Sequence, residues 1–220
     1  MKGRFFLVLS FLLVIQSFEA LAITSCLKRI KQTLTRSRQY SLDLDKDFKK
    51  VLSEIREEYL LNPHRVYNTS GSIPKGTKYG VNDKVYQVEY FLGGGAEGEN
   101  YVVRELIEGR PGEKKVLKFF KDQANEHQKE NIELLKFWRG RGIPTVDIEV
   151  YSPLQKLAVI GYREGVALEY LFRHPNVPDF RKQQLRHLFD VMNRKAGGDL
   201  SSFNTILDIK NGEIVVIDAI

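Results

Sequence analysis

Between residues 41 and 61, apolar side chains recur three and four positions apart, and charged residues fill many of the positions between them. This repeat predicts an amphipathic helix, because residues with that spacing share one helix face. The apolar positions are Phe48, Val51, Leu52, Ile55, Tyr59 and Leu60. We expect the helix, with its lead-in, to pack against another element. Within this N-terminal region (41–83), the Pro- and Gly-rich residues 62–80 predict a turn-rich connector.

From residue 84 onward, runs of β-branched and aromatic residues replace the helical repeat. Turn-rich segments separate the first three runs, so we expect an antiparallel meander with strands at 84–92, 100–107 and 114–120. The later expected elements are a helix at 123–138, strands at 145–151 and 156–162, and an amphipathic helix at 179–195. This order predicts an α+β fold with two lobes: an antiparallel sheet with one helix, then a reduced, mainly helical lobe.

Residues 1–22 have the three-part pattern of an export signal. Lys2 and Arg4 give a positive start, residues 5–15 are almost wholly apolar, and Ala20–Ala22 is a small-residue cleavage site. We therefore expect a signal peptide and a secreted or periplasmic protein. The alternative is an uncleaved membrane anchor, which the positive charges after the segment would favour.

The formal net charge of +6 is concentrated near the N-terminus. Five Lys and Arg residues lie at 28–38, within an arm at 23–40, whereas residues 39–220 carry equal numbers of acidic and basic residues. We therefore expect no nucleic-acid partner for the globular part. The arm is either a solvated flank or a contact for an anionic surface such as lipid. The single cysteine excludes an internal disulfide framework and a multi-cysteine metal site.

A Gly-rich stretch, LGGGAEGENYVV, occupies residues 92–103, where the first two expected strands meet. Gly93, Gly95 and Gly98 have the spacing G-x-G-x-x-G. A dinucleotide-binding fingerprint would open a helix after the last glycine, whereas Tyr101 and the two valines after it continue as a strand. Two interpretations remain: a flexible hairpin loop, or a hairpin whose backbone N–H groups approach nucleotide phosphates.

Lys118 is the one charged residue in the apolar run 116–120. A cation on a buried strand is costly unless it is paired or faces an anion; an outward-facing lysine on a half-exposed strand is the alternative. The candidate partners on the following helix are Glu126, Glu130 and Glu133. We choose Glu130, because Leu134 and Phe137 would place that helix face inward.

Three polar residues near residue 200 and beyond have the spacing of a phosphoryl-transfer site. Asp199 and Asn204 are five positions apart, and an expected hairpin with an Asn211–Gly212 turn ends its return strand at Asp218. In kinase chemistry an Asp orients the acceptor hydroxyl, and an Asn and a second Asp hold metal ions. The alternative is that Asp199 caps a turn and that Asp218 is a solvated strand end.

In their order and spacing, these motifs resemble the protein-kinase-like superfamily over residues 84–220. The Gly-rich hairpin, Lys118 and Glu130 resemble its N-lobe, at 84–162. The segment LAVIGYREGVALEYLF resembles a strand, the hinge and the first C-lobe helix, with Gly161, Tyr162 and Arg163 near the adenine. The stretches GGDLSSFN and VVIDAI resemble the catalytic loop and the metal-binding strand, in a reduced C-lobe at 163–220.

The resemblance implies ATP and Mg²⁺ as cofactors. The catalytic residues that it implies are Asp199, Lys118 and Glu130. The nucleotide-binding residues that it implies are Gly93, Gly95, Gly98, Lys118 and Tyr162. Asn204 and Asp218 would be the metal ligands.

The chain also departs from ordinary protein kinases. Gly197 stands where a His usually braces the catalytic loop, Ser201 where Ser/Thr kinases commonly carry a Lys, and Asp218–Ile220 replaces D-F-G. No activation segment is recognisable, as in the short kinase-like effectors of bacterial pathogens. We therefore expect an exported, minimal protein kinase that acts on a protein hydroxyl, Ser or Thr by preference, in a host cell. The alternatives are a small-molecule or lipid-sugar phosphotransferase and a nucleotide-binding pseudokinase.

Overall fold

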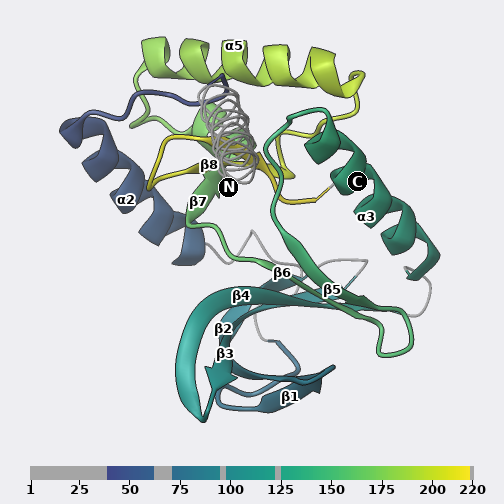
Figure 1. The fold of residues 1–220 in the computed structure, drawn as a ribbon. Helices are drawn as coiled ribbons and strands as arrows, with labels where there is room; N and C mark the ends of the chain where they lie inside the picture. Colours follow the sequence, from purple (N-terminus) through teal and green to yellow (C-terminus); the bar gives the residue numbers. More distant parts are fainter. Residues whose placement is uncertain (1–38, 62–70, 95–97, 122–124, 219–220) are drawn as a thin grey trace, which may run out of the picture. The chain divides into compact units, whose positions relative to one another are not determined.

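The computed structural model describes residues 39–61, 71–94, 98–121 and 125–218 (Figure 1). The expected signal peptide, most of the basic arm and Gly95 lie outside these ranges. All the elements below lie in one compact unit, Tyr40–Ile220.

A curled antiparallel sheet of six strands holds the expected meander (Figure 1). Its spatial order is β1-β2-β3-β4-β6-β5, and every neighbouring pair is antiparallel. The strands are β1 (Lys78–Val81), β2 (Lys84–Gly94), β3 (Gly98–Ile107), β4 (Arg110–Phe120), β5 (Ile148–Ser152) and β6 (Leu157–Gly161). The pairing of β2 with β3 shifts register twice, between Val88 and Tyr90 and between Phe91 and Gly93. Such bulges bend a strand, which accounts for the curl next to the Gly-rich turn.

A second sheet of three strands contains the hairpin that was expected after Asn204. Its strands are β7 (Gly165–Ala167), β8 (Thr205–Asp208) and β9 (Ile214–Val216), in that spatial order. The turn between β8 and β9 places Gly212 at φ 73°, a left-handed conformation that favours glycine. The Gly212 N–H donates to the Asp208 carbonyl at 2.8 Å and closes the turn.

Four helices accompany these sheets in the described residues: α2 (Lys46–Leu61), α3 (Asn125–Gly140), α4 (Leu168–Arg173) and α5 (Asp179–Ala196). The carboxylate of Asp45 accepts a hydrogen bond from the Phe48 N–H at 2.8 Å and so caps the start of α2. This hydrogen bond, with Arg181 beside it, lowers the pKa of Asp45. Arg181 also donates to the Asp43 carbonyl at 3.1 Å, so α5 holds the lead-in to α2.

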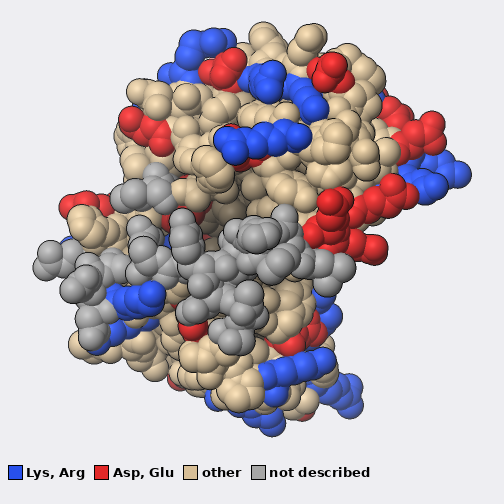
Figure 2. All heavy atoms as spheres, turned by 180° about the vertical axis from the view of Figure 1, so that it is seen from behind, with Lys and Arg blue, Asp and Glu red and all other residues tan. Residues whose placement is uncertain are grey.

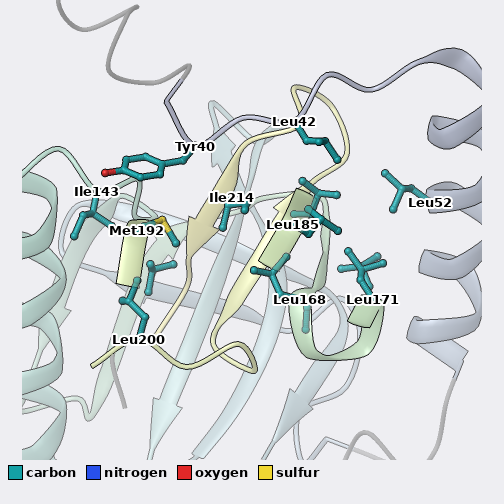
Figure 3. Close-up of a cluster of buried hydrophobic side chains, with 14 of the residues drawn as sticks. Tyr40, Leu42, Leu52, Ile143, Leu168, Leu171, Leu185, Met192, Leu200 and Ile214 are labelled. Carbon is teal, nitrogen blue, oxygen red and sulfur yellow. The ribbon is translucent and has the colours of Figure 1, made fainter. Parts of the chain in front are cut away.

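Helix α2 is part of the main hydrophobic core and not a separate appendage. Leu52 is fully buried and lies in one cluster with Leu168, Leu171 and Leu185 of α4 and α5 (Figure 3). The residues before α2 lie beside the start of β9 in space. The Ile214 N–H donates to the Tyr40 carbonyl, and the Leu42 N–H donates to the Gly212 carbonyl. The expected amphipathic helix therefore finds its partner in the small sheet and the two helices around it.

Helix α3 joins the two sheets. Its Ile132 packs with Phe120 and Ala158 of the larger sheet, whereas Leu135 and Trp138 belong to the main core. Near its end, the Arg139 guanidinium donates to the Thr145 hydroxyl at 3.0 Å and pairs with Asp147 at 2.9 Å. Thr145 in turn forms a parallel bridge with Val216 of β9.

The surface of the described residues carries both signs of charge, as expected from the balanced composition beyond residue 39. Figure 2 shows acidic and basic side chains interspersed on the face opposite to that of Figure 1. None of the described helices is both long and apolar enough to cross a bilayer.

Candidate functional site

A cavity of about 410 Å³ lies where the two sheets meet, and its size is within the range of small-molecule sites. Its polar wall contains Gly93, Gly94, Gly98, Lys118, Asn204 and Asp218. Its apolar wall contains Leu92, Val116, Val146, Ile160, Ile206 and Ile217. The structure therefore gathers at one cavity most of the described residues that the sequence singled out.

The glycines of the β2–β3 turn line this cavity at the ends of their strands. Gly93 and Gly94 end β2 and Gly98 begins β3, while Gly95 lies outside the described residues. A Cβ at Gly98 would lie 1.8 Å from the Phe119 carbonyl oxygen. Glycine is thus required there by the close pairing of β3 with β4, whatever the cavity binds.

Lys118 projects from the middle of the large sheet, between Asn100 of β3 and Ala158 of β6 in the strand register. The residue is 9% exposed, and its ammonium nitrogen lies 2.5 Å from Asp218 Oδ2. A buried cation needs such a partner, because burial without one is costly. The described partner is a carboxylate that follows β9.

The expected pairing of Lys118 with Glu130 requires a correction. Glu130 is exposed, and exposed Glu133 pairs with Lys136 at 3.3 Å. Phe137, expected inward, is 54% exposed. Among the α3 side chains that the structure describes, the buried ones are Gln128, Asn131, Ile132, Leu135 and Trp138. The side chain of Glu126 lies outside the described residues. The helix phase was misjudged because its buried face includes two amides, which blur the apolar repeat.

Asn204 and Asp218 lie at the same end of the β8–β9 hairpin. Thr205 pairs with Val216, and the Ile217 N–H donates to the Asn204 carbonyl at 2.8 Å. Both site residues are half-buried and line the cavity. The hairpin expected from the sequence therefore brings the two proposed metal ligands to one place.

Asp199 does not share this position. It is exposed and is not among the residues that line the cavity. The two residues before it end α5: Gly197 has φ 99°, and the Gly198 N–H donates to the Asn193 carbonyl at 2.9 Å. The glycines of the GGD stretch thus serve as a helix C-cap. The Asn193 side chain also accepts the Leu200 N–H at 2.9 Å, which ties the loop to α5.

The cavity is also lined by residues from the end of β6 to the start of β7 and by α2. Gly161, Tyr162, Arg163 and Gly165 line it, together with Arg56, Tyr59 and Leu60. The Tyr162 hydroxyl accepts a hydrogen bond from the Arg56 guanidinium at 2.9 Å and lies 3.4 Å from the Tyr90 hydroxyl. Burial raises the pKa of Tyr90, and the contact with Tyr162 raises it further, so this hydroxyl stays protonated.

The α2 residues of this wall were not identified from the sequence. They lie before every motif that carries the resemblance, and on a sequence basis Arg56 is one of many charges on an amphipathic helix. Phe203 was missed as well: it is 65% exposed and lines the cavity next to Asn204. Only the tertiary packing of α2 shows that its residues line the cavity.

The donor set of the cavity fits magnesium together with a phosphorylated ligand. Magnesium commonly takes one or two carboxylates and completes its octahedron with waters and phosphate oxygens. Asp218 supplies a carboxylate, Asn204 an amide oxygen and Lys118 a cation for phosphate. Among the described residues, no group of three or more His, Cys, Asp or Glu side chains could hold a metal ion. The phosphates of a bound ligand would therefore have to supply part of the magnesium coordination.

Comparison with known protein families gives no match to any family model. No curated protein matches the chain either. Roles for the cavity residues are therefore inferred from their geometry and chemistry.

Proposed function

We propose that the chain is a minimal kinase-like phosphotransferase that binds ATP and Mg²⁺ in this cavity. The Lys118–Asp218 contact, in a cavity that also contains Asn204 and the turn glycines, is the observation that carries the proposal. Kinases need this combination: a strand lysine for the phosphates, a Gly-rich hairpin beside them, and an Asp with an Asn for magnesium. The order of these residues along the chain supports the proposed two-lobed, protein-kinase-like fold.

Each residue then has a defined task. Lys118 contacts the phosphate chain, and the backbone of Gly93 and Gly94 approaches it without side chains in the way. Asp218 and Asn204 hold magnesium, which neutralises negative charge at the transferring phosphoryl group. In this proposal Asp218 keeps its contact with the Lys118 ammonium group while it binds the metal.

The acceptor in this proposal is a protein hydroxyl, on Ser or Thr by preference, and Asp199 orients it. Asp199 lies on an exposed loop, where a large acceptor can reach it. With a signal peptide at 1–22, the substrate belongs to a compartment outside the producing cell that contains ATP, such as a host cytoplasm. A small molecule or a lipid-linked sugar would offer the same hydroxyl chemistry, so acceptor panels of both classes belong in the assay.

A second candidate function is nucleotide binding without turnover. The position of Asp199 outside the cavity lining favours it, because a base must come within about 3 Å of the proton it accepts. This pseudokinase-like module would use the same cavity and the same Lys118, Asn204 and Asp218.

Phosphoryl transfer is tested by incubating the purified chain with γ-labelled ATP, magnesium and a mixed cell lysate. The proposal predicts labelled protein with the wild type and none with Asp218→Ala. Asp190→Ala, at an exposed position on α5, is the matched control and should label like the wild type. Equal labelling with Asp218→Ala would contradict the proposed site, whereas magnesium-dependent binding of ATP without any labelling would favour the second candidate.

A further inference from the structure

The last turns of α2 form part of the cavity wall, although α2 precedes the whole segment that resembles a kinase. Arg56, Tyr59 and Leu60 line the cavity, and Tyr59 also packs on Tyr170 of α4 with ring centroids 5.0 Å apart. The core contacts of Leu52 fix the helix behind them. The wall is therefore a built part of the fold.

Arg56 is held in a defined orientation at this wall. Its Nη1 lies 3.2 Å from the Glu164 carboxylate, and its Nη2 donates to the Tyr162 hydroxyl at 2.9 Å. The side chain is only 19% exposed. A guanidinium group has five N–H donors in a rigid plane, so these two contacts orient it and leave further donors for a ligand. The Glu164 carboxylate balances the positive charge of Arg56. Arg56 can therefore donate hydrogen bonds to a neutral acceptor without being an unpaired charge in the cavity wall.

The strand register shows how far Tyr162, the hydrogen-bond partner of Arg56, lies from Lys118 along the chain. Lys118 lies opposite Ala158 on β6, and Tyr162 follows four residues further along the chain. An extended chain advances about 3.3 Å per residue, so the backbone of Tyr162 lies roughly 13 Å along the chain from that of Ala158. The contact of Tyr162 with Arg56 is therefore displaced along the chain from the residue that faces Lys118, on the side left for the nucleoside once Lys118 contacts the phosphates.

We infer that Arg56 binds the nucleoside half of the ligand and donates hydrogen bonds to oxygen or nitrogen acceptors of the ribose or the base. This inference rests on the proposed nucleotide binding. It makes α2 a part of the site, so that the first helix of the compact unit contributes to ligand selection.

Calorimetric titrations with three ligands separate the two ends of the cavity: ATP with magnesium, adenosine, and inorganic tripolyphosphate. Loss of a charge-assisted hydrogen bond weakens binding roughly ten-fold. Arg56→Ala should therefore lower the affinities for ATP and for adenosine by the same factor of about ten and leave the affinity for tripolyphosphate unchanged. Lys118→Met should lower the affinities for ATP and tripolyphosphate and leave the affinity for adenosine unchanged. Lys50→Ala, on the exposed face of the same helix, is the matched control and should change none of the affinities.

Two further measurements distinguish direct binding from support of the wall. Glu164→Gln keeps an acceptor for Arg56 but removes the negative charge at residue 164. The affinity of this variant for adenosine should be within about two-fold of that of the wild type. Urea unfolding without ligand should give similar midpoints for Arg56→Ala and Lys50→Ala. If Arg56→Ala left the affinity for adenosine unchanged, or lowered the affinity for tripolyphosphate as much as that for adenosine, the inference about Arg56 would be overturned. The proposed function would not be affected by that result. A wild type that binds neither ATP nor adenosine would overturn the proposed function as well.

Discussion

The ammonium nitrogen of Lys118 lies 2.5 Å from Oδ2 of Asp218, although 100 positions separate these residues in the chain. The contact joins the centre of the six-stranded sheet to the end of the small hairpin. The two side chains are 11% and 25% exposed, so their charges are screened less than those of a surface pair. This charged pair at the cavity is the basis of the function proposed here.

The position of α2 in the main core gives a first prediction. Leu52 is fully buried among α4 and α5 side chains, so Leu52→Ala should lower the free energy of unfolding by about 2–5 kcal/mol. Urea unfolding followed by circular dichroism measures this change. Lys50→Ala, exposed on the same helix, should change it by less than about 0.5 kcal/mol. Equal stability of the two variants would mean that α2 does not pack in this core.

The close pairing of β3 with β4 gives a second prediction. A Cβ at Gly98 would meet the Phe119 carbonyl oxygen at 1.8 Å, so Gly98→Ala must push the strands apart. We expect a loss of about 1–3 kcal/mol in the free energy of unfolding, the usual range for overpacking. Gly80→Ala is the control, because a Cβ there meets no atom within 4 Å. Thermal unfolding of both variants is the measurement, and unchanged stability of Gly98→Ala would contradict the described register.

Glu213 gives a prediction about pH. Burial raises the pKa of its carboxyl group; Arg163 opposes this effect and Asp208 adds to it. The folded state therefore holds the proton more tightly than the unfolded state, and stability falls as the pH rises from the ordinary Glu pKa through the raised one. Glu213→Gln removes this penalty. It should be more stable than the wild type near pH 7 and similar near about pH 4.

Melting temperatures of the Glu213→Gln variant and the wild type across this pH range provide the measurement. Glu54→Gln, at an exposed position on α2, is the control and should leave the wild-type profile unchanged. If Glu213→Gln were less stable than the wild type at pH 7, the carboxylate would be a stabilising group and the assigned direction of its pKa shift would be wrong.

Much of the secondary structure could be predicted, because it depends on local patterns. The β-branched runs of the meander became β2, β3 and β4, and the Asn211–Gly212 turn closed the β8–β9 hairpin as expected. The apolar repeat of 179–195 became α5 (Asp179–Ala196). The short elements β1 and β7 were missed, since four and three residues are too few to establish a period. The six-residue helix α4 was expected only from the resemblance of its segment to a first C-lobe helix.

The parts that failed depend on tertiary contacts. The phase of α3 was wrong because buried Gln128 and Asn131 replace apolar residues on its inner face. Glu130 was chosen as the partner of Lys118 but is exposed, whereas the described partner, Asp218, follows β9 and lies near Lys118 only in the folded chain. The role of α2 had no local signal at all, because an amphipathic pattern indicates that a face is buried and not which element buries it.

The central claim is that Asp218 holds magnesium for a bound nucleotide, and calorimetric titration of ATP with and without magnesium tests it most directly. Wild type, Asp218→Ala and Asp199→Ala are compared under the same conditions. Asp218→Ala should lose the magnesium-dependent part of ATP affinity together with transfer activity, because it lacks the carboxylate ligand. Asp199→Ala should bind ATP as the wild type does and lose about 10²- to 10⁴-fold in turnover, the contribution of a general base. Unchanged magnesium-dependent affinity in Asp218→Ala would contradict the account, because Asp218 would then not be a metal ligand.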